Sequence, residues 1–119
     1  MKWAHVPERD DPLALLIWAF TFAVRDTYHS ISENMQELFE GKGEIGGDPG
    51  WEIDRHADDI QNEYFEIWVD PRVSEVEESH CVYDGETVRR TMHQILEAFA
   101  NTYPQSRKEA MDIIRRYHL

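Results

Sequence analysis

The sequence predicts a mainly α-helical domain, a compact bundle of about four helices. Three observations lead to this prediction. Apolar residues recur every three or four positions along most of the chain, which is the period of a helix with one buried face. Helix-start signals precede four of these stretches. The chain contains neither internal repeats nor low-complexity tracts, and its 119 residues fit a single helical domain spanning residues 1–119.

The first predicted helix begins at Asp11-Pro12. Aspartate accepts hydrogen bonds from the free amides of a helix start, and proline fits the first helical position. Apolar residues then step by three or four to about residue 40, where the glycine-rich loop 41–50 ends the helix. Ser30–Glu33 matches a capping box, so a break of this helix near residue 30 is an open alternative.

A second helix is predicted from Pro49 to about Val69, because helical spacing resumes behind Asp48-Pro49. The end of this helix is ambiguous. Residues 64–69, YFEIWV, have strong strand propensity and alternate in character, and residues 80–83, HCVY, offer a partner strand. A small β-hairpin between residues 64 and 83 is therefore the alternative to helix here.

The last two predicted helices occupy the C-terminal third of the chain. Asp84 can cap the third helix, whose apolar positions continue to Tyr103 before Pro104 ends it. Ser106–Glu109 matches a second capping box and predicts a short fourth helix behind it.

Charge is distributed unevenly along the sequence. The chain has 24 acidic and 12 basic residues, a net charge of −12, and 15 of the acids lie between Glu33 and Glu78. An acidic field repels nucleic acid and anionic membranes and speeds association with basic proteins. The predicted partner is therefore a basic protein, with no direct nucleic-acid or membrane binding.

The densest acidic stretch is residues 52–66, EIDRHADDIQNEYFE, with six carboxylates against one arginine. It predicts an acidic inhibitor that neutralises a basic partner, such as an immunity protein or antitoxin acting on a nuclease-type toxin. Carboxylates would pair with the partner's bases, and nearby aromatic residues would anchor the contact. The predicted partner-binding residues are Glu52, Asp54, Asp58, Asp59, Glu63, Glu66, Trp51 and Trp68, with Glu75, Glu77 and Glu78 as a second patch.

Two other interpretations stay open. In the first, the acidity only keeps the domain soluble and the tryptophans belong to the core. In the second, the spacing of Glu37-x-x-Glu40 and Glu63-x-x-Glu66 resembles that of all-α nucleotide pyrophosphohydrolases. That resemblance implies a metal-dependent enzyme in which Glu37, Glu40, Glu63 and Glu66 hold Mg²⁺ on two facing helices. The family has aspartate where this chain has Glu66.

The favoured prediction is a binding protein, not an enzyme, with no cofactor and no metal. The sequence lacks a nucleophile-elbow serine, a phosphate-binding glycine loop and zinc-ligand spacing. Cys81 is the only cysteine, which excludes an intrachain disulfide and favours a reducing compartment. With neither a signal peptide nor a membrane span expected, the predicted location is the cytoplasm.

Overall fold

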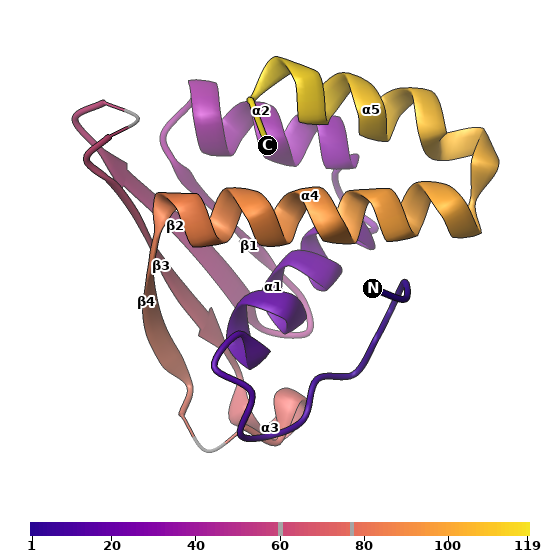
Figure 1. Cartoon of the computed structure of the whole chain (residues 1–119). Helices are drawn as coiled ribbons and strands as arrows, with labels where there is room; N and C mark the ends of the chain where they lie inside the picture. Colours follow the sequence, from indigo (N-terminus) through magenta and orange to yellow (C-terminus); the bar gives the residue numbers. More distant parts are fainter. Residues whose placement is uncertain (60, 77) are drawn as a thin grey trace.

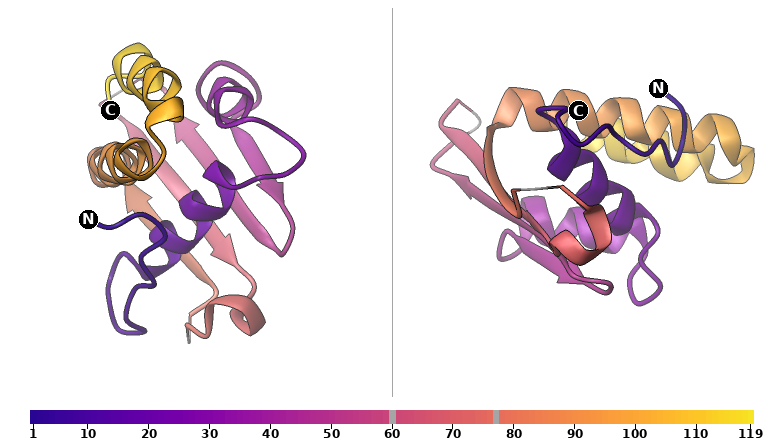
Figure 2. Two further views of the ribbon diagram at one scale, coloured as in Figure 1. Left: turned by 90° about the vertical axis from the view of Figure 1, so that its right-hand side faces the viewer. Right: turned by 90° about the horizontal axis from the view of Figure 1, so that it is seen from below.

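The computed structural model describes residues 1–59, 61–76 and 78–119 and has an α+β fold (Figure 1). Four strands form one antiparallel sheet in the order β1-β2-β3-β4. The long helices all lie on one face of this sheet, and none of the described helices covers the other face (Figure 2). The prediction of a mainly α-helical, all-α four-helix bundle is therefore wrong.

The sheet occupies the middle of the chain. Its strands are β1 (Glu44–Gly47), β2 (Trp51–Ala57), β3 (Glu63–Val69) and β4 (His80–Asp84). Burial alternates along β3, where Phe65, Ile67 and Val69 are buried and the residues between them are more exposed. This period of two is that of a strand with one face on the core. The predicted helix from Pro49 to Val69 is therefore replaced by β2, β3 and the turn between them.

The hairpin alternative was closer to the structure. β3 pairs antiparallel with β4, with Tyr64 opposite Asp84 and Trp68 opposite His80. This pairing joins the two segments that showed strand propensity in the sequence. It is one part of a larger sheet, because β2 pairs along the other edge of β3.

Helices flank the sheet in sequence. They are α1 (Ala14–Val24), α2 (Ile31–Glu40), α3 (Pro71–Ser74), α4 (Gly85–Thr102), η1 (Pro104–Ser106) and α5 (Arg107–Arg116). The break near residue 30 is confirmed, because Ser30 and Glu33 make both hydrogen bonds of a capping box at the start of α2. Asp84 caps α4 by accepting from the amide of Thr87. Within the described residues, no helix is both long and apolar enough to cross a membrane.

The core lies between the sheet and the helices. α1 is central to it, since most of its residues are buried, and this agrees with a segment that is apolar nearly all round. The buried side chains come from α1, from the inward positions of the strands and from α4. They include Leu16, Phe20, Ile53, Phe65, Ile67, Met92 and Leu96. Burying these side chains against one face of the sheet leaves its opposite face free to contact other molecules.

Candidate functional site

The uncovered face of the sheet carries an acidic surface. Successive side chains of a strand point to opposite faces, so every second residue of each strand lies on this side. We define the outer sheet face as Glu44, Glu52, Asp54, His56, Tyr64, Glu66, Trp68, His80 and Val82. Asp84, opposite Tyr64 at the end of β4, is left out of this set because its carboxylate caps α4. The set contains four carboxylates and neither lysine nor arginine.

Three of these carboxylates stand in a row across neighbouring strands. The register places Glu44 directly opposite Asp54, and Asp54 directly opposite Glu66. Like charges in directly opposite positions destabilise an antiparallel pair. The row is therefore maintained against its own electrostatic repulsion.

Asp54, at the centre of the row, is the carboxylate in the least favourable surroundings. Its Oδ1 atom is buried and has no hydrogen-bond partner among the described residues. Burial raises the pKa of Asp54, and the neighbouring carboxylates of the row and of Glu52 raise it further, whereas His56 acts in the opposite direction. The folded protein therefore holds the proton of Asp54 more tightly than the unfolded chain does.

Asp54→Asn is expected to raise the free energy of unfolding at neutral pH by about 0.5 kcal/mol. A raised folded-state pKa means that the charged form of Asp54 opposes folding, and asparagine removes that charge. The gain should shrink as the pH falls and Asp54 becomes protonated in the parent protein. Urea unfolding at neutral and acidic pH checks this. A variant less stable than the parent at neutral pH would contradict it.

Glu66 lies between two histidines from the neighbouring strands. Its Oε1 atom is 2.8 Å from Nε2 of His56 on β2, and its Oε2 atom is 3.1 Å from Nε2 of His80 on β4. The His56 ring also stacks on Tyr64, with ring centroids 4.7 Å apart. The outer sheet face thus contains two groups that can become positively charged, both directed at one carboxylate.

Large apolar side chains are exposed among these charges. Trp68 is 37% exposed, Tyr64 43% and Val82 56%. Aromatic residues are enriched in protein–protein interfaces, where their broad surfaces supply much of the contact. The outer sheet face therefore combines carboxylates with apolar anchors.

The structure separates the predicted partner-binding residues into groups. Glu52, Asp54, Glu66 and Trp68 lie together on the outer sheet face. Asp58 and Asp59 are exposed in the turn after β2, where Asp59 Oδ1 accepts from the amides of Gln61 and Asn62. Trp51 and Glu63 are buried on the opposite, helix-covered side.

The second predicted patch lies around α3. Glu75 ends α3, and Glu78 accepts from the Cys81 thiol at 3.4 Å, while Glu77 lies outside the described residues.

The predicted partner-binding set leaves out five residues of the outer sheet face: Glu44, His56, Tyr64, His80 and Val82. The signal that identifies three of them is the strand alternation in residues 64–69 and 80–83. That alternation groups Tyr64 with Glu66 and Trp68, and His80 with Val82.

Glu63 is the centre of a buried ion cluster. It accepts from Nε of Arg55 at 2.7 Å and from Nε and Nη2 of Arg89 at 2.7 and 2.8 Å. Both guanidinium groups also lie over the ring of Phe39. Burial alone would raise the pKa of Glu63, but the hydrogen bonds and charges of Arg89 and Arg55 lower it, and the net result is a pKa below its usual value. Glu63 therefore has a structural role.

The four carboxylates of the enzyme interpretation do not converge. Residues three apart on a strand point to opposite faces, so Glu63 is directed at the helices and Glu66 at the outer sheet face. Glu40 is bonded to Arg116 and Tyr117 instead. Among residues 1–59, 61–76 and 78–119, no group of three or more His, Cys, Asp or Glu side chains is placed to hold a metal ion.

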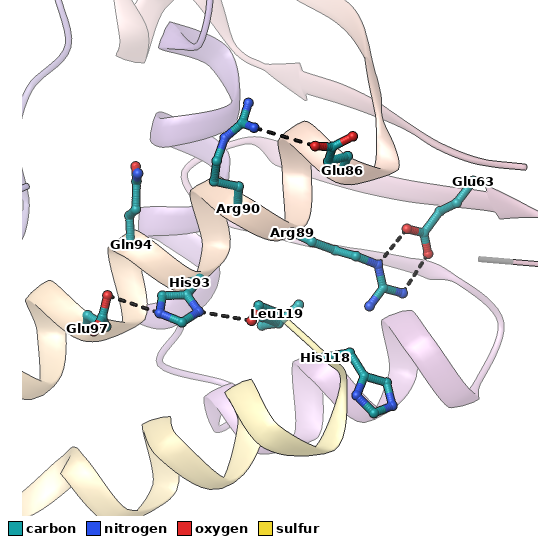
Figure 3. A pocket seen from close by; sticks show the side chains of 9 residues that line it. All are labelled: Glu63, Glu86, Arg89, Arg90, His93, Gln94, Glu97, His118 and Leu119. Carbon is teal, nitrogen blue, oxygen red and sulfur yellow. Dashed lines mark hydrogen bonds and ion pairs between the residues drawn. The ribbon is translucent and has the colours of Figure 1, made fainter. Parts of the chain in front are cut away.

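A cavity of about 620 Å³ lies on the other side of the molecule, between α4 and the last residues of the chain (Figure 3). Three pairs of its charged or titratable side chains lie within ion-pair distance of each other. Arg89 binds Glu63, Arg90 lies 3.8 Å from Glu86, and His93 is 3.0 Å from Glu97 and 2.9 Å from the carbonyl of Leu119. Arg89, Arg90 and His93 are already engaged within the protein, so the cavity offers less binding chemistry than the outer sheet face.

Comparisons with protein families, with curated proteins and with solved structures found no match. The chemistry of the outer sheet face is therefore the basis for a functional proposal.

Proposed function

We propose that this protein is an acidic binding protein that neutralises a basic partner by docking the outer sheet face onto it. The observation that carries the proposal is the row formed by Glu44, Asp54 and Glu66. Repulsion between these like charges lowers the stability of the free protein. Such destabilising arrangements are concentrated at functional sites. Lysine or arginine side chains of a partner would supply the missing counter-charges.

The surroundings of the row support a protein partner. Trp68, Tyr64 and Val82 provide exposed apolar area beside the carboxylates. Interfaces typically combine such anchors with complementary charge. Asp58 and Asp59, exposed in the neighbouring turn, extend the acidic surface beyond the strands.

The basic partner is expected to be a nucleic-acid enzyme, with the protein acting as an immunity protein or antitoxin against a nuclease-type toxin. Surfaces that bind single-stranded nucleic acids combine a basic groove with aromatic platforms. The outer sheet face presents the complement, because its carboxylates project from neighbouring strands, whose backbones lie about 4.8 Å apart, and from alternate residues of a strand, whose Cα atoms lie about 6.7 Å apart. The chain has a single cysteine, which is consistent with a protein that acts in the reducing cytoplasm.

Charge reversal at Glu44 and Glu52 is expected to weaken binding of a deca-arginine peptide by at least about tenfold. Both residues are exposed on the outer sheet face, so the variant Glu44→Lys/Glu52→Lys should keep its fold. The matched control is Glu86→Lys/Asp112→Lys, which makes the same change in net charge on the exposed surfaces of α4 and α5. Isothermal titration calorimetry at low salt should give a control affinity within about twofold of the parent. Equal weakening by both variants would show that net charge alone governs binding and would contradict the proposal.

A further inference from the structure

His56 and His80 are the only residues of the outer sheet face that can become positively charged. They reach the same carboxylate from opposite sides, with their Nε2 atoms 2.8 and 3.1 Å from the two oxygens of Glu66. Both side chains are also exposed, His56 to 44% and His80 to 53%, so solvent protons reach them freely. Two titratable groups are thus built into the surface that the proposed function assigns to docking.

The charged groups around these histidines come from four strands. On β4, Asp84 lies opposite Tyr64, and its carboxylate accepts from the amide and the hydroxyl of Thr87 at the start of α4. β1 contributes Glu44, β2 contributes Glu52 and Asp54, and β3 contributes Glu66 together with the phenol of Tyr64. In the part of the chain that the structure describes, no long helix covers this side of the sheet (Figure 2). The electrostatic balance of the surface is therefore decided by these carboxylates and by the protonation of the two imidazoles.

We propose that His56 and His80 make docking pH-dependent, so that a basic partner binds while the imidazoles are neutral and is released when both are protonated. This inference rests on the proposed function. With neutral imidazoles the outer sheet face carries four carboxylates, Glu44, Glu52, Asp54 and Glu66, and a charge of −4. Protonation of both imidazoles halves this charge to −2.

Protonation also engages Glu66. Each protonated Nε2 donates a charge-assisted hydrogen bond to one oxygen of this carboxylate, so Glu66 is less available to a cation of the partner. Histidine is the side chain that ordinarily changes charge between about pH 5 and 8. Asp54 acts in the same direction, because its proton uptake on further acidification removes another negative charge. All three changes favour release in acid.

The test uses a deca-arginine peptide as the probe, because arginine keeps its charge over this pH range and cannot itself cause a pH dependence. At constant ionic strength, the affinity of the parent protein should fall by about tenfold between about pH 7.5 and 5.5. In His56→Gln/His80→Gln the affinity should change by less than about twofold between these two pH values. The control His5→Gln/His29→Gln removes two exposed histidines elsewhere and should keep the full fall.

The outcomes separate the inference from the proposed function. An absence of peptide binding near pH 7.5 would overturn the proposed function. Binding that falls equally in the parent and in His56→Gln/His80→Gln would overturn only the role of the two histidines. NMR titration of the parent imidazoles gives a readout that needs no variant. Added peptide should move the titration midpoints of His56 and His80 to lower pH, and unmoved midpoints would contradict the inference.

Discussion

Glu63→Gln is expected to lower the free energy of unfolding by about 3 kcal/mol, because it leaves two arginines without their anionic partner inside the protein. The Glu63 side chain is fully buried and receives three hydrogen bonds from Arg55 and Arg89. Burying a charge without its counter-charge is much more costly than burying the pair. Glutamine keeps the shape of the side chain but not the charge.

The loss of stability in Glu63→Gln should affect several secondary-structure elements at once. Arg89 comes from α4, donates to the carbonyl of Tyr117 near the C-terminus, and lies over Phe39 of α2. The lowered pKa of Glu63 means that the ion cluster stabilises the fold above the ordinary carboxyl range and that this contribution disappears as the pH falls through the folded-state pKa. The difference between parent and variant should therefore be largest near neutral pH and shrink in acid.

Urea unfolding measures this effect, and the same strand supplies a matched control. Glu66→Gln makes the identical substitution three residues later on the exposed side of β3, and it should change the free energy of unfolding by no more than about 0.5 kcal/mol. Similar losses in the two variants would show that Glu63 is not the centre of a buried cluster.

Trp51→Ala is expected to destabilise the protein by about 3–5 kcal/mol, the usual cost of removing a large aromatic side chain from a core. Trp51 is 2% exposed and lies on the helix-covered side of β2. Trp68, on the outward side of β3, is 37% exposed. Trp68→Ala should therefore cost less than about 1 kcal/mol of stability while weakening binding of the deca-arginine peptide.

Thermal unfolding and calorimetry of the two tryptophan variants separate core from interface. The expected pattern is a large fall in melting temperature with Trp51→Ala and a loss of affinity at nearly unchanged stability with Trp68→Ala. Unchanged affinity in the Trp68 variant would remove this side chain from the docking surface.

Local signals in the sequence predicted several helix starts, although the expected capping box at Ser106–Glu109 is not formed, because the Ser106 side chain makes no cap hydrogen bond. The capping box at Ser30–Glu33 and the cap at Asp84 rely on interactions within a few residues, and the structure contains both. Signals of this kind act through neighbouring backbone amides, so they can be recognised without knowledge of the rest of the chain.

The sheet could not be predicted in the same way. A spacing of four residues fits a helix, but it also keeps two residues on the same face of a strand. Tyr64 and Trp68 follow this spacing, which predicts a helix, but both are exposed on the outer sheet face. β1 was interpreted as loop because of its glycines. A Cβ atom at Gly46 would lie 2.8 Å from the carbonyl oxygen of Trp51, so glycine permits the close approach of β2.

The sequence identified the acidic segment but not the direction of its side chains. Glu63 and Glu66 are equivalent by composition, and only the strand alternation separates a buried carboxylate from an exposed one. The main partner of Glu63 is Arg89, 26 residues later, and no local pattern connects them. The opposition of Glu44, Asp54 and Glu66 likewise depends on the register between strands. Both features arise from tertiary structure.

The most direct measurement of the central claim is an amide NMR titration of the protein with the deca-arginine peptide. Shift changes concentrated on the residues of the outer sheet face, from β1 to β4, and weakened by Glu44→Lys/Glu52→Lys, are the result expected of a docking surface there. Shift changes confined to α4 and α5, or spread evenly over all exposed acids, would contradict it.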